Sequence, residues 1–212
     1  MITEKIRKVL VLAPHTDDGE MGAGGTISLL LEQGAKVFYA AFSTAEESVP
    51  AHLPKDILRT EVKNATQKLG IDEANLIIFN YQVRKLNYHR QEILEDLITL
   101  RNSEDFDLIL MPSLNDIHQD HLTMAQEGLR AFKTKSILGY ELIWNNLTFN
   151  TTCFVRLQEN HIRNKIKALE EYKSQKGREY MSEDFVLSLA HTRGIQIGCE
   201  YAEAFEVVRW VI

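Results

Sequence analysis

Short runs of apolar and β-branched residues alternate along the chain with longer segments of helical periodicity. The first run, 8–13, is apolar throughout, which is typical of a strand buried on both faces of a parallel sheet. Strands are predicted at 8–13, 37–42, 76–79, 107–111, 136–143, 152–157 and 205–211. Helices are predicted at 22–33, 55–69, 91–101, 120–132, 159–173 and 184–190. This alternation predicts an α/β fold, a Rossmann-like domain with a mainly parallel sheet flanked by helices.

Nothing in the sequence marks a boundary between domains. The 212 residues contain no repeat, no low-complexity segment and no plausible linker, and a chain of this length fits one domain of ordinary size. We therefore predict a single domain that spans residues 1–212. A chain this long buries enough surface to fold without disulfide bonds.

The composition limits the cellular compartment and the classes of binding partner that we expect for this protein. The formal net charge of −6 argues against nucleic acid or an anionic membrane surface as a partner. The two cysteines, Cys153 and Cys199, lack a metal-binding spacing and suit a reducing compartment. Residues 1–5 lack the plan of a signal peptide, and no apolar run approaches the roughly 18–20 residues of a membrane span. These features predict a cytoplasmic protein and leave self-association into a homo-oligomer open.

Histidine and aspartate gather directly after two of the predicted strands. The first segment, after strand 8–13, is His15-Thr16-Asp17-Asp18. The second, after strand 107–111, is Asn115-Asp116-Ile117-His118-Gln119-Asp120-His121. Because ligands of open parallel sheets lie beyond the carboxyl ends of the strands, we expect both segments at the same edge of the sheet.

The two segments supply the ligands that a catalytic divalent metal requires. Such a metal takes about three protein ligands from neutral imidazole and carboxylate groups and keeps a position open for water. His15 and Asp18 are three residues apart, so a tight turn from strand to helix can direct both at one point. His118 and His121 have the same spacing, and one or both can reach the metal. The remaining aspartates can accept a proton or hold a histidine in one tautomer.

Each segment alone also has an ordinary structural explanation. An aspartate after a strand commonly caps the next helix, and acids at a helix N-terminus are stabilising without any ligand. Two such clusters at the ends of two strands favour a metal site over this explanation. The cluster Gly22-x-Gly24-Gly25 is comparable with a dinucleotide-binding loop. Nearby acids would repel a pyrophosphate, so we predict that these glycines let the helix pack closely on the first strand.

The two motifs together resemble the PIG-L/LmbE family of zinc-dependent de-N-acetylases. The family pattern is His-x-Asp-Asp, three residues and Gly-x-Gly-Gly-Thr, followed later by His-x-Asp-His. These match residues 15–26 and 118–121. The resemblance continues through Arg59-Thr60-Glu61 and Tyr172-Lys173-Ser174-Gln175, so it covers most of the chain. It implies a hydrolase that removes the N-acetyl group of an amino sugar.

The resemblance also implies a role for particular residues. The family's zinc ligands match His15, Asp18 and His121. Its general base matches Asp17, which would accept a proton from the attacking water. His118 matches a histidine that stabilises the tetrahedral intermediate, and we expect it to do so as a cationic hydrogen-bond donor. Asp120 would orient a neighbouring histidine, and the position of Arg59 suggests a contact with the substrate.

Three positions depart from the usual family pattern. Thr16 stands where proline is common, and it should be tolerated because that position shapes the turn without contributing a ligand. Gly19 stands where a glutamate is common, with Glu20 one place later, which is similar to a variant within the family. Many members carry an arginine where Ile117 stands, so no substrate contact is assigned there.

We therefore expect an enzyme that hydrolyses an N-acetyl group on a small amino-sugar substrate and releases acetate, with one Zn²⁺ or another divalent metal per chain. Two alternatives differ in class. Non-haem iron(II) enzymes use a similar set of two histidines and one carboxylate, but normally on a β-sandwich barrel. A binding or regulatory protein of this fold would carry a vestigial site, and retention of the motif residues counts against it. The sequence does not identify the sugar.

Overall fold

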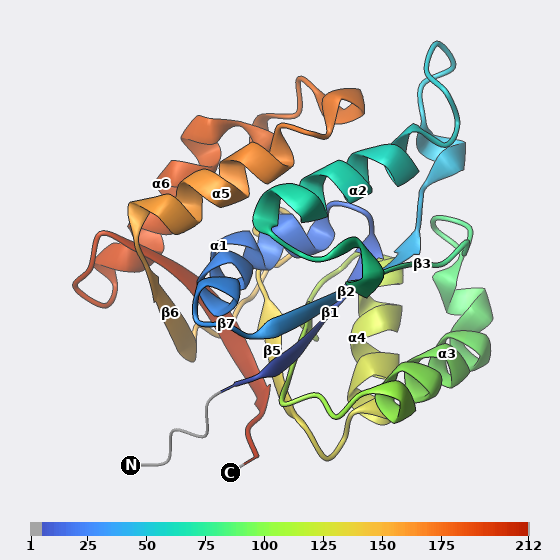
Figure 1. Cartoon of the computed structure of the whole chain (residues 1–212), viewed down its shortest axis with the longest axis horizontal. Helices are drawn as coiled ribbons and strands as arrows, with labels where there is room; N and C mark the ends of the chain where they lie inside the picture. Colours follow the sequence, from blue (N-terminus) through green and yellow to red (C-terminus); the bar gives the residue numbers. More distant parts are fainter. Residues whose placement is uncertain (1–5, 212) are drawn as a thin grey trace.

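A computed structural model of the chain describes residues 6–211 (Figure 1). The strands are β1 (Lys8–His15), β2 (Lys36–Ser43), β3 (Leu76–Ile78), β4 (Leu108–Pro112), β5 (Ser136–Tyr140), β6 (Cys153–Leu157) and β7 (Tyr201–Arg209). The helices are α1 (Asp18–Glu32), α2 (Ile57–Leu69), α3 (Arg90–Ser103), α4 (Gln119–Ala131), α5 (Glu159–Leu169) and α6 (Glu183–Ile195). Residues 1–5, on which the expectation about a signal peptide rests, lie outside the described residues.

One sheet of seven strands organises the fold, in the order β3-β2-β1-β4-β5-β7-β6. Across the sheet, the neighbours β3, β2, β1, β4 and β5 pair in parallel. Strand β7 is antiparallel to both β5 and β6. The expected α/β class with a mainly parallel sheet is therefore confirmed. Among the residues that the structure describes, no helix combines the length and apolar character that a membrane crossing needs.

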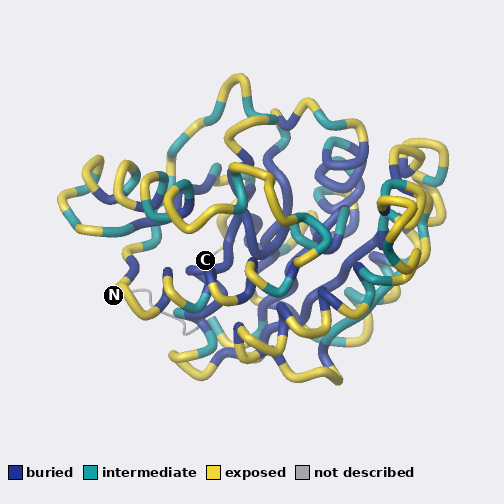
Figure 2. Tube along the Cα trace, turned by 90° about the horizontal axis from the view of Figure 1, so that it is seen from above, coloured by how far each residue is buried: buried dark blue, intermediate teal, exposed yellow. Residues whose placement is uncertain are grey.

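Helices cover both faces of the sheet, and the central strand shows why. Alternate residues of a strand point to opposite faces. Val9 and Val11 belong to the apolar cluster built with α1, α2 and α5. Leu10 and Leu12 belong to the cluster built with α3 and α4. The apolar run 8–13, which predicted a strand buried on both faces, thus lies between two layers of helices. Figure 2 shows the buried part of the chain at the centre and the exposed turns outside.

Helix α1 begins at Asp18, four residues before the predicted start, with Asp17 at its N-cap. The sequence predicted that this helix begins at Gly22, although glycines lower helix propensity. The packing requires them, because a Cβ on Gly22 would lie 2.2 Å from a ring carbon of the buried Tyr140. The glycines do let this helix pack closely, but against β5, α5 and β6, and not against the first strand as expected. Asp18 is placed in the first turn of the helix.

A buried carboxylate, Glu203 of β7, binds both the backbone of α1 and a lysine of α5. The Glu203 carboxylate accepts hydrogen bonds from the backbone N–H groups of Gly25 at 3.0 Å and Thr26 at 2.7 Å. It also accepts one from Lys165 Nζ of α5 at 2.8 Å, and both charged side chains are buried. Since a buried charge is tolerated only when it is paired and hydrogen-bonded, each partner depends on the other.

Removing the ammonium group should therefore destabilise the fold. We expect Lys165→Met to lower the free energy of unfolding by about 3 kcal/mol, because Glu203 keeps its burial and loses its counter-charge. Lys167→Met is the matched control, since Lys167 lies on the same helix with an exposed side chain, and it should change stability by less than about 0.5 kcal/mol. Urea unfolding at pH 7 measures both values, and equal effects would contradict this account of the pair.

Candidate metal centre

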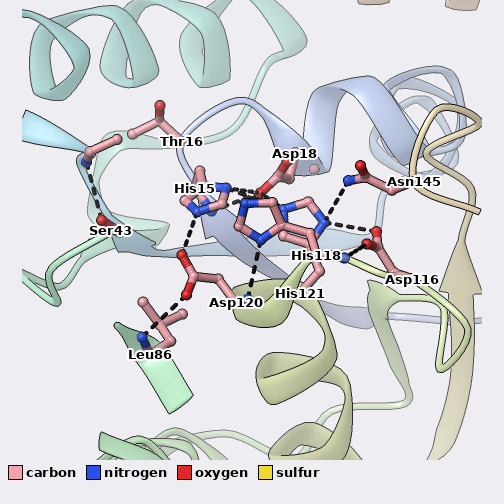
Figure 3. A network of polar contacts seen from close by, with 12 residues as sticks. His15, Thr16, Asp18, Ser43, Leu86, Asp116, His118, Asp120, His121 and Asn145 are labelled. Atoms are coloured by element: carbon pink, nitrogen blue, oxygen red, sulfur yellow. Dashed lines mark hydrogen bonds and ion pairs between the residues drawn. The ribbon is translucent and has the colours of Figure 1, made fainter. Parts of the chain in front are cut away.

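Two neighbouring strands bring the two histidine–aspartate segments together. His15 is the last residue of β1 and Asp18 the first residue of α1. His118 is the N-cap of α4, and His121 lies in the first turn of that helix. Because β1 and β4 pair in parallel, their carboxyl ends meet at one edge of the sheet. Figure 3 shows the three imidazole rings and the carboxylate of Asp18 converging there.

Three atoms that could bind a metal form a nearly equilateral triangle at this edge. Asp18 Oδ2 lies 3.1 Å from His15 Nδ1 and 3.3 Å from His121 Nε2. The two ring nitrogens are 3.2 Å apart. Zinc binds such ligands at about 2.0–2.1 Å, and two ligands at tetrahedral corners are then about 3.3 Å apart. The triangle therefore fits one face of a four-coordinate zinc site and leaves a corner free.

Each member of the triangle is held by a second partner. His15 Nε2 lies 2.9 Å from Asp120 Oδ2, and His121 Nδ1 lies 2.8 Å from Asp116 Oδ2. Asp18 Oδ2 accepts a hydrogen bond from the backbone N–H of His15 at 2.8 Å. Carboxylates in these places fix the ring orientation and raise the basicity of the nitrogen that faces the metal. Asp116 was not among the predicted site residues, although its carboxylate in the second segment was a visible signal.

The charges of the cluster favour a cation at its centre. Burial opposes the charged form of both histidines, but the neighbouring carboxylates together outweigh it, with Asp18 the largest contributor among them. Together with Asp120, Asp18 raises the pKa of His15 to about 9, and together with Asp116 it raises the pKa of His121 to about 10. The same two rings hold the pKa of Asp18 well below its usual range despite burial. A metal that replaces the ring protons satisfies the same electrostatic demand.

His118 lies beside the triangle in a different hydrogen-bonding state. Its ring centroid is 5.0 Å from that of His15 and 4.5 Å from that of His121, and donor atoms of the three histidines lie within 4.8 Å of one another. His118 Nδ1 accepts the backbone N–H of Asp120 at 3.2 Å, which places the ring proton on Nε2. Burial and the two neighbouring histidines lower the pKa of His118 to about 4. These contacts favour a neutral imidazole at this position over the expected cationic donor.

A cavity opens beside the cluster, and Asp17 lines it together with His15, Asp18, His118 and His121. The side chain of Asp17 does not cap α1, although Asp17 is the N-cap residue. Burial makes the largest contribution to the pKa of Asp17, the negative charge of Asp18 the second largest, and together they raise it to about 6. A carboxylate with this pKa can accept a proton near neutral pH.

Glu20 does not line the cavity and lies buried behind the turn. The hydroxyls of Tyr39 and Tyr172 are in hydrogen-bond contact with its carboxyl group. They also reach the carbonyl oxygen of Thr16, at 2.8 Å from Tyr39 and 2.7 Å from Tyr172. Burial raises the pKa of Glu20 to about 8. This cluster clamps the peptide between His15 and Asp17, and Thr16 shapes the turn through its backbone.

The structure does not bring Arg59 to the cavity. Its guanidinium donates to Asn80 Oδ1, and the preceding residue, Leu58, lines the wall instead. Two other arginines, Arg84 and Arg178, line the cavity and were not predicted from the sequence. They stand in connecting segments with no recognisable motif, so no signal in the sequence marked them.

Comparison with known proteins identifies a family for the part of the chain that carries this site. The family model described as GlcNAc-PI de-N-acetylase, PIG-L, matches residues 10–132. This stretch is more than half of the chain and contains both histidine–aspartate segments.

Individual relatives are more distant. The chain is 26% identical over 176 residues to the uncharacterized deacetylase YaiS of Escherichia coli (strain K12), an alignment that covers 80% of this chain and 92% of that protein. It is 27% identical over 140 residues to a probable N-acetyl-alpha-D-glucosaminyl L-malate deacetylase 2 of Bacillus cereus (strain ATCC 14579), covering 59% of this chain and 60% of the relative.

A solved structure shares the fold across nearly the whole chain. The N,N'-diacetylchitobiose deacetylase from Pyrococcus horikoshii superposes with a TM-score of 0.81 at 24% identity. The match covers 97% of this chain and 85% of that one. The match of the family model to more than half of the sequence decides the assignment, and the expected family is confirmed. The chain belongs to the GlcNAc-PI de-N-acetylase (PIG-L) family.

Proposed function

We propose that this protein is a metal-dependent hydrolase that removes the N-acetyl group from a small amino-sugar substrate and releases acetate. The observation that carries the proposal is the triangle of His15 Nδ1, Asp18 Oδ2 and His121 Nε2, with edges of 3.1–3.3 Å, beside the carboxylate of Asp17. The family and the deacetylase names of the relatives support the N-acetyl group as the target. We further propose that residues 1–212 act as one domain and that the protein works in the cytoplasm, as its two unpaired cysteines support.

His15, Asp18 and His121 would hold one zinc ion per chain, or another divalent metal. When bound, zinc polarises the amide carbonyl and lowers the pKa of a water ligand toward about 7. Asp120 and Asp116 would keep the two imidazoles oriented with the correct nitrogen toward the metal.

Asp17 would act as the general base and then as the general acid. As water attacks the carbonyl carbon, Asp17 would take its proton, and it would return that proton to the nitrogen as the carbon–nitrogen bond breaks. The products balance as acetate and a free amine. Glu20, Tyr39 and Tyr172 contribute indirectly, because they fix the turn that carries Asp17.

His118 would stabilise the negative charge that develops on the carbonyl oxygen. Its Nε2–H is the available donor, since Nδ1 accepts the backbone N–H of Asp120. A preorganised neutral donor of this kind acts in the transition state without a change of protonation. The ring would lie beside the metal ligands and leave the open coordination position to water.

The proposal is tested by metal content and acetate release. We expect purified protein to carry about one divalent metal per chain, and to lose it in Asp18→Ala and His121→Ala, because each removes one corner of the triangle. Acetate release from a panel of N-acetyl sugars should require that metal and proceed without oxygen or a reductant. Stoichiometric metal retained in both variants would refute the site. Metal binding without any acetate release would favour the vestigial protein, and activity that depends on iron and oxygen would favour the non-haem iron enzyme.

Replacing the base should separate chemistry from metal binding. Asp17→Asn keeps the shape but removes the proton acceptor, so we expect full metal content and a turnover lower by about 10²- to 10⁴-fold. In the wild type, activity requires ionised Asp17, so kcat/KM should fall as the pH decreases through the pKa of this group. That pKa is about 6 in the protein alone, and a bound cation lowers it further. The acidic limb should be absent from Asp17→Asn, and near-wild-type turnover would assign the base elsewhere.

His118 should affect turnover without affecting the metal. We expect His118→Ala to keep the metal and near-normal KM while kcat falls by about 10²- to 10³-fold, as for other oxyanion donors. Because the ring is neutral, the variant should retain any alkaline limb of the pH–rate profile. His118→Gln restores an N–H donor and should recover part of the rate. Metal loss in a folded His118→Ala protein would make this residue a fourth ligand.

A further inference from the structure

Two arginines face the same cavity as the metal triangle. Arg84 comes from the segment between β3 and α3, and Arg178 from the segment between α5 and α6. Both side chains belong to exposed residues. They are far apart in the sequence, and the fold brings both to the cavity that contains the candidate metal ligands.

Neither arginine is neutralised by a carboxylate within the described part of the chain. Four other arginines form ion pairs with glutamates: Arg90, Arg130, Arg163 and Arg193. Four more donate to neutral oxygens and do not line the cavity: Arg59, Arg101, Arg156 and Arg209. Within the cavity, Arg84 Nη2 donates to the Ser48 hydroxyl at 3.0 Å, and Arg178 Nη1 donates to the Tyr180 hydroxyl at 2.5 Å. Hydroxyl partners orient a guanidinium but leave its positive charge in place. In a chain of net charge −6, two such cations beside one cavity call for an explanation.

Arg84 is held in position by the metal site itself. Its backbone lies in the left-handed region with φ of 63°, which is costly for a residue with a side chain and is found where surrounding contacts impose it. Those contacts are visible: the Arg84 N–H donates to Asp120 Oδ2 at 2.6 Å, and its carbonyl accepts from Gln119 Nε2 at 2.9 Å. Asp120 is also the partner of His15. One carboxylate therefore fixes both a proposed metal ligand and the arginine.

Arg178 stands at the end of an aromatic platform. Its guanidinium carbon lies 5.8 Å from the centroid of the Tyr180 ring. Tyr180 stacks on Trp144 at 4.3 Å with an interplanar angle of 20°, and both rings line the cavity. A flat aromatic surface next to a cation suits a ligand that has an apolar face, such as a sugar ring, and an anionic substituent.

We propose that Arg84 and Arg178 form an anion-binding subsite, and that the amino-sugar substrate carries a carboxylate or phosphate group which they bind. This inference rests on the proposed function, and it adds the charge of the substrate. Guanidinium groups bind both anions through paired, charge-assisted hydrogen bonds. The alternative is that Arg178 serves only to balance Asp17, but no ion-pair contact joins the two among the described residues, and Arg84 would remain unexplained.

The experiment compares three sugars on the metal-loaded protein: methyl N-acetylglucosaminide, its carboxymethyl analogue and N-acetylglucosamine 1-phosphate. We expect kcat/KM for one of the anionic sugars to exceed that for the neutral sugar by about 10- to 100-fold. The better of the two identifies the anion as carboxylate or phosphate. Arg84→Gln and Arg178→Gln should each reduce this ratio by about 10-fold, through KM. Taking the ratio cancels any general loss of chemistry in a variant.

Arg156→Gln is the matched control, because Arg156 is exposed on β6 and does not line the cavity. It removes the same charge and should leave the ratio unchanged. Raising the ionic strength should lower kcat/KM for the anionic sugar more than for the neutral one. This difference between the two sugars should be smaller in Arg84→Gln and Arg178→Gln.

The possible results separate this inference from the proposed function. If the three sugars react equally, or if the ratio survives both substitutions, the anion subsite is refuted while the deacetylase function stands. If no sugar reacts, calorimetric titration of the same anionic sugars decides. Binding that weakens in Arg84→Gln and Arg178→Gln supports the subsite and refutes the reaction, whereas absence of binding to the wild type, or binding insensitive to both substitutions, refutes the subsite.

Discussion

Three donor atoms held 3.1–3.3 Å apart are the constraint on which the rest of this structure depends. Imidazole nitrogens and a carboxylate keep such a spacing only if each is fixed from behind. Asp120 fixes His15, Asp116 fixes His121, and a backbone N–H fixes Asp18. These supports come from both segments, so the site requires β1 and β4 to be neighbours in one parallel sheet.

The start of α1 is held from the other side. A tight turn brings Asp17 and Asp18 to the sheet edge, and the Tyr39 and Tyr172 hydroxyls bind the carbonyl oxygen inside that turn. Further along, the glycines of α1 allow close packing, and Glu203 accepts hydrogen bonds from the helix backbone. The polar groups buried behind the site thus position a helix whose first residue is a proposed metal ligand.

The cavity has charge of both signs, and its layout bears on what it accepts. Acidic groups lie at the sheet edge, where a divalent cation would meet them, whereas Arg84 and Arg178 stand on the connecting segments. Segments of this kind vary most readily among proteins that share a fold, because they carry little of the core. The part of the cavity that carries the two arginines can therefore differ among proteins that share this fold.

The sequence by itself determined the class of fold, the order of its elements and the two segments that form the candidate metal site. It could do so because these features are local: a buried strand shows as an apolar run, and His-x-Asp-Asp and His-x-Asp-His are short motifs at strand ends. It placed the start of α1 four residues too late, and it could not show that Gly22 packs on the ring of Tyr140, which is distant in the chain. Only the tertiary structure decided the lowered pKa of His118 and which arginines line the cavity. Arg59 lies outside the cavity, whereas Arg84 and Arg178 line it. Each depends on contacts between residues far apart in the chain, and a protonation state or a cavity wall exists only once those contacts are made.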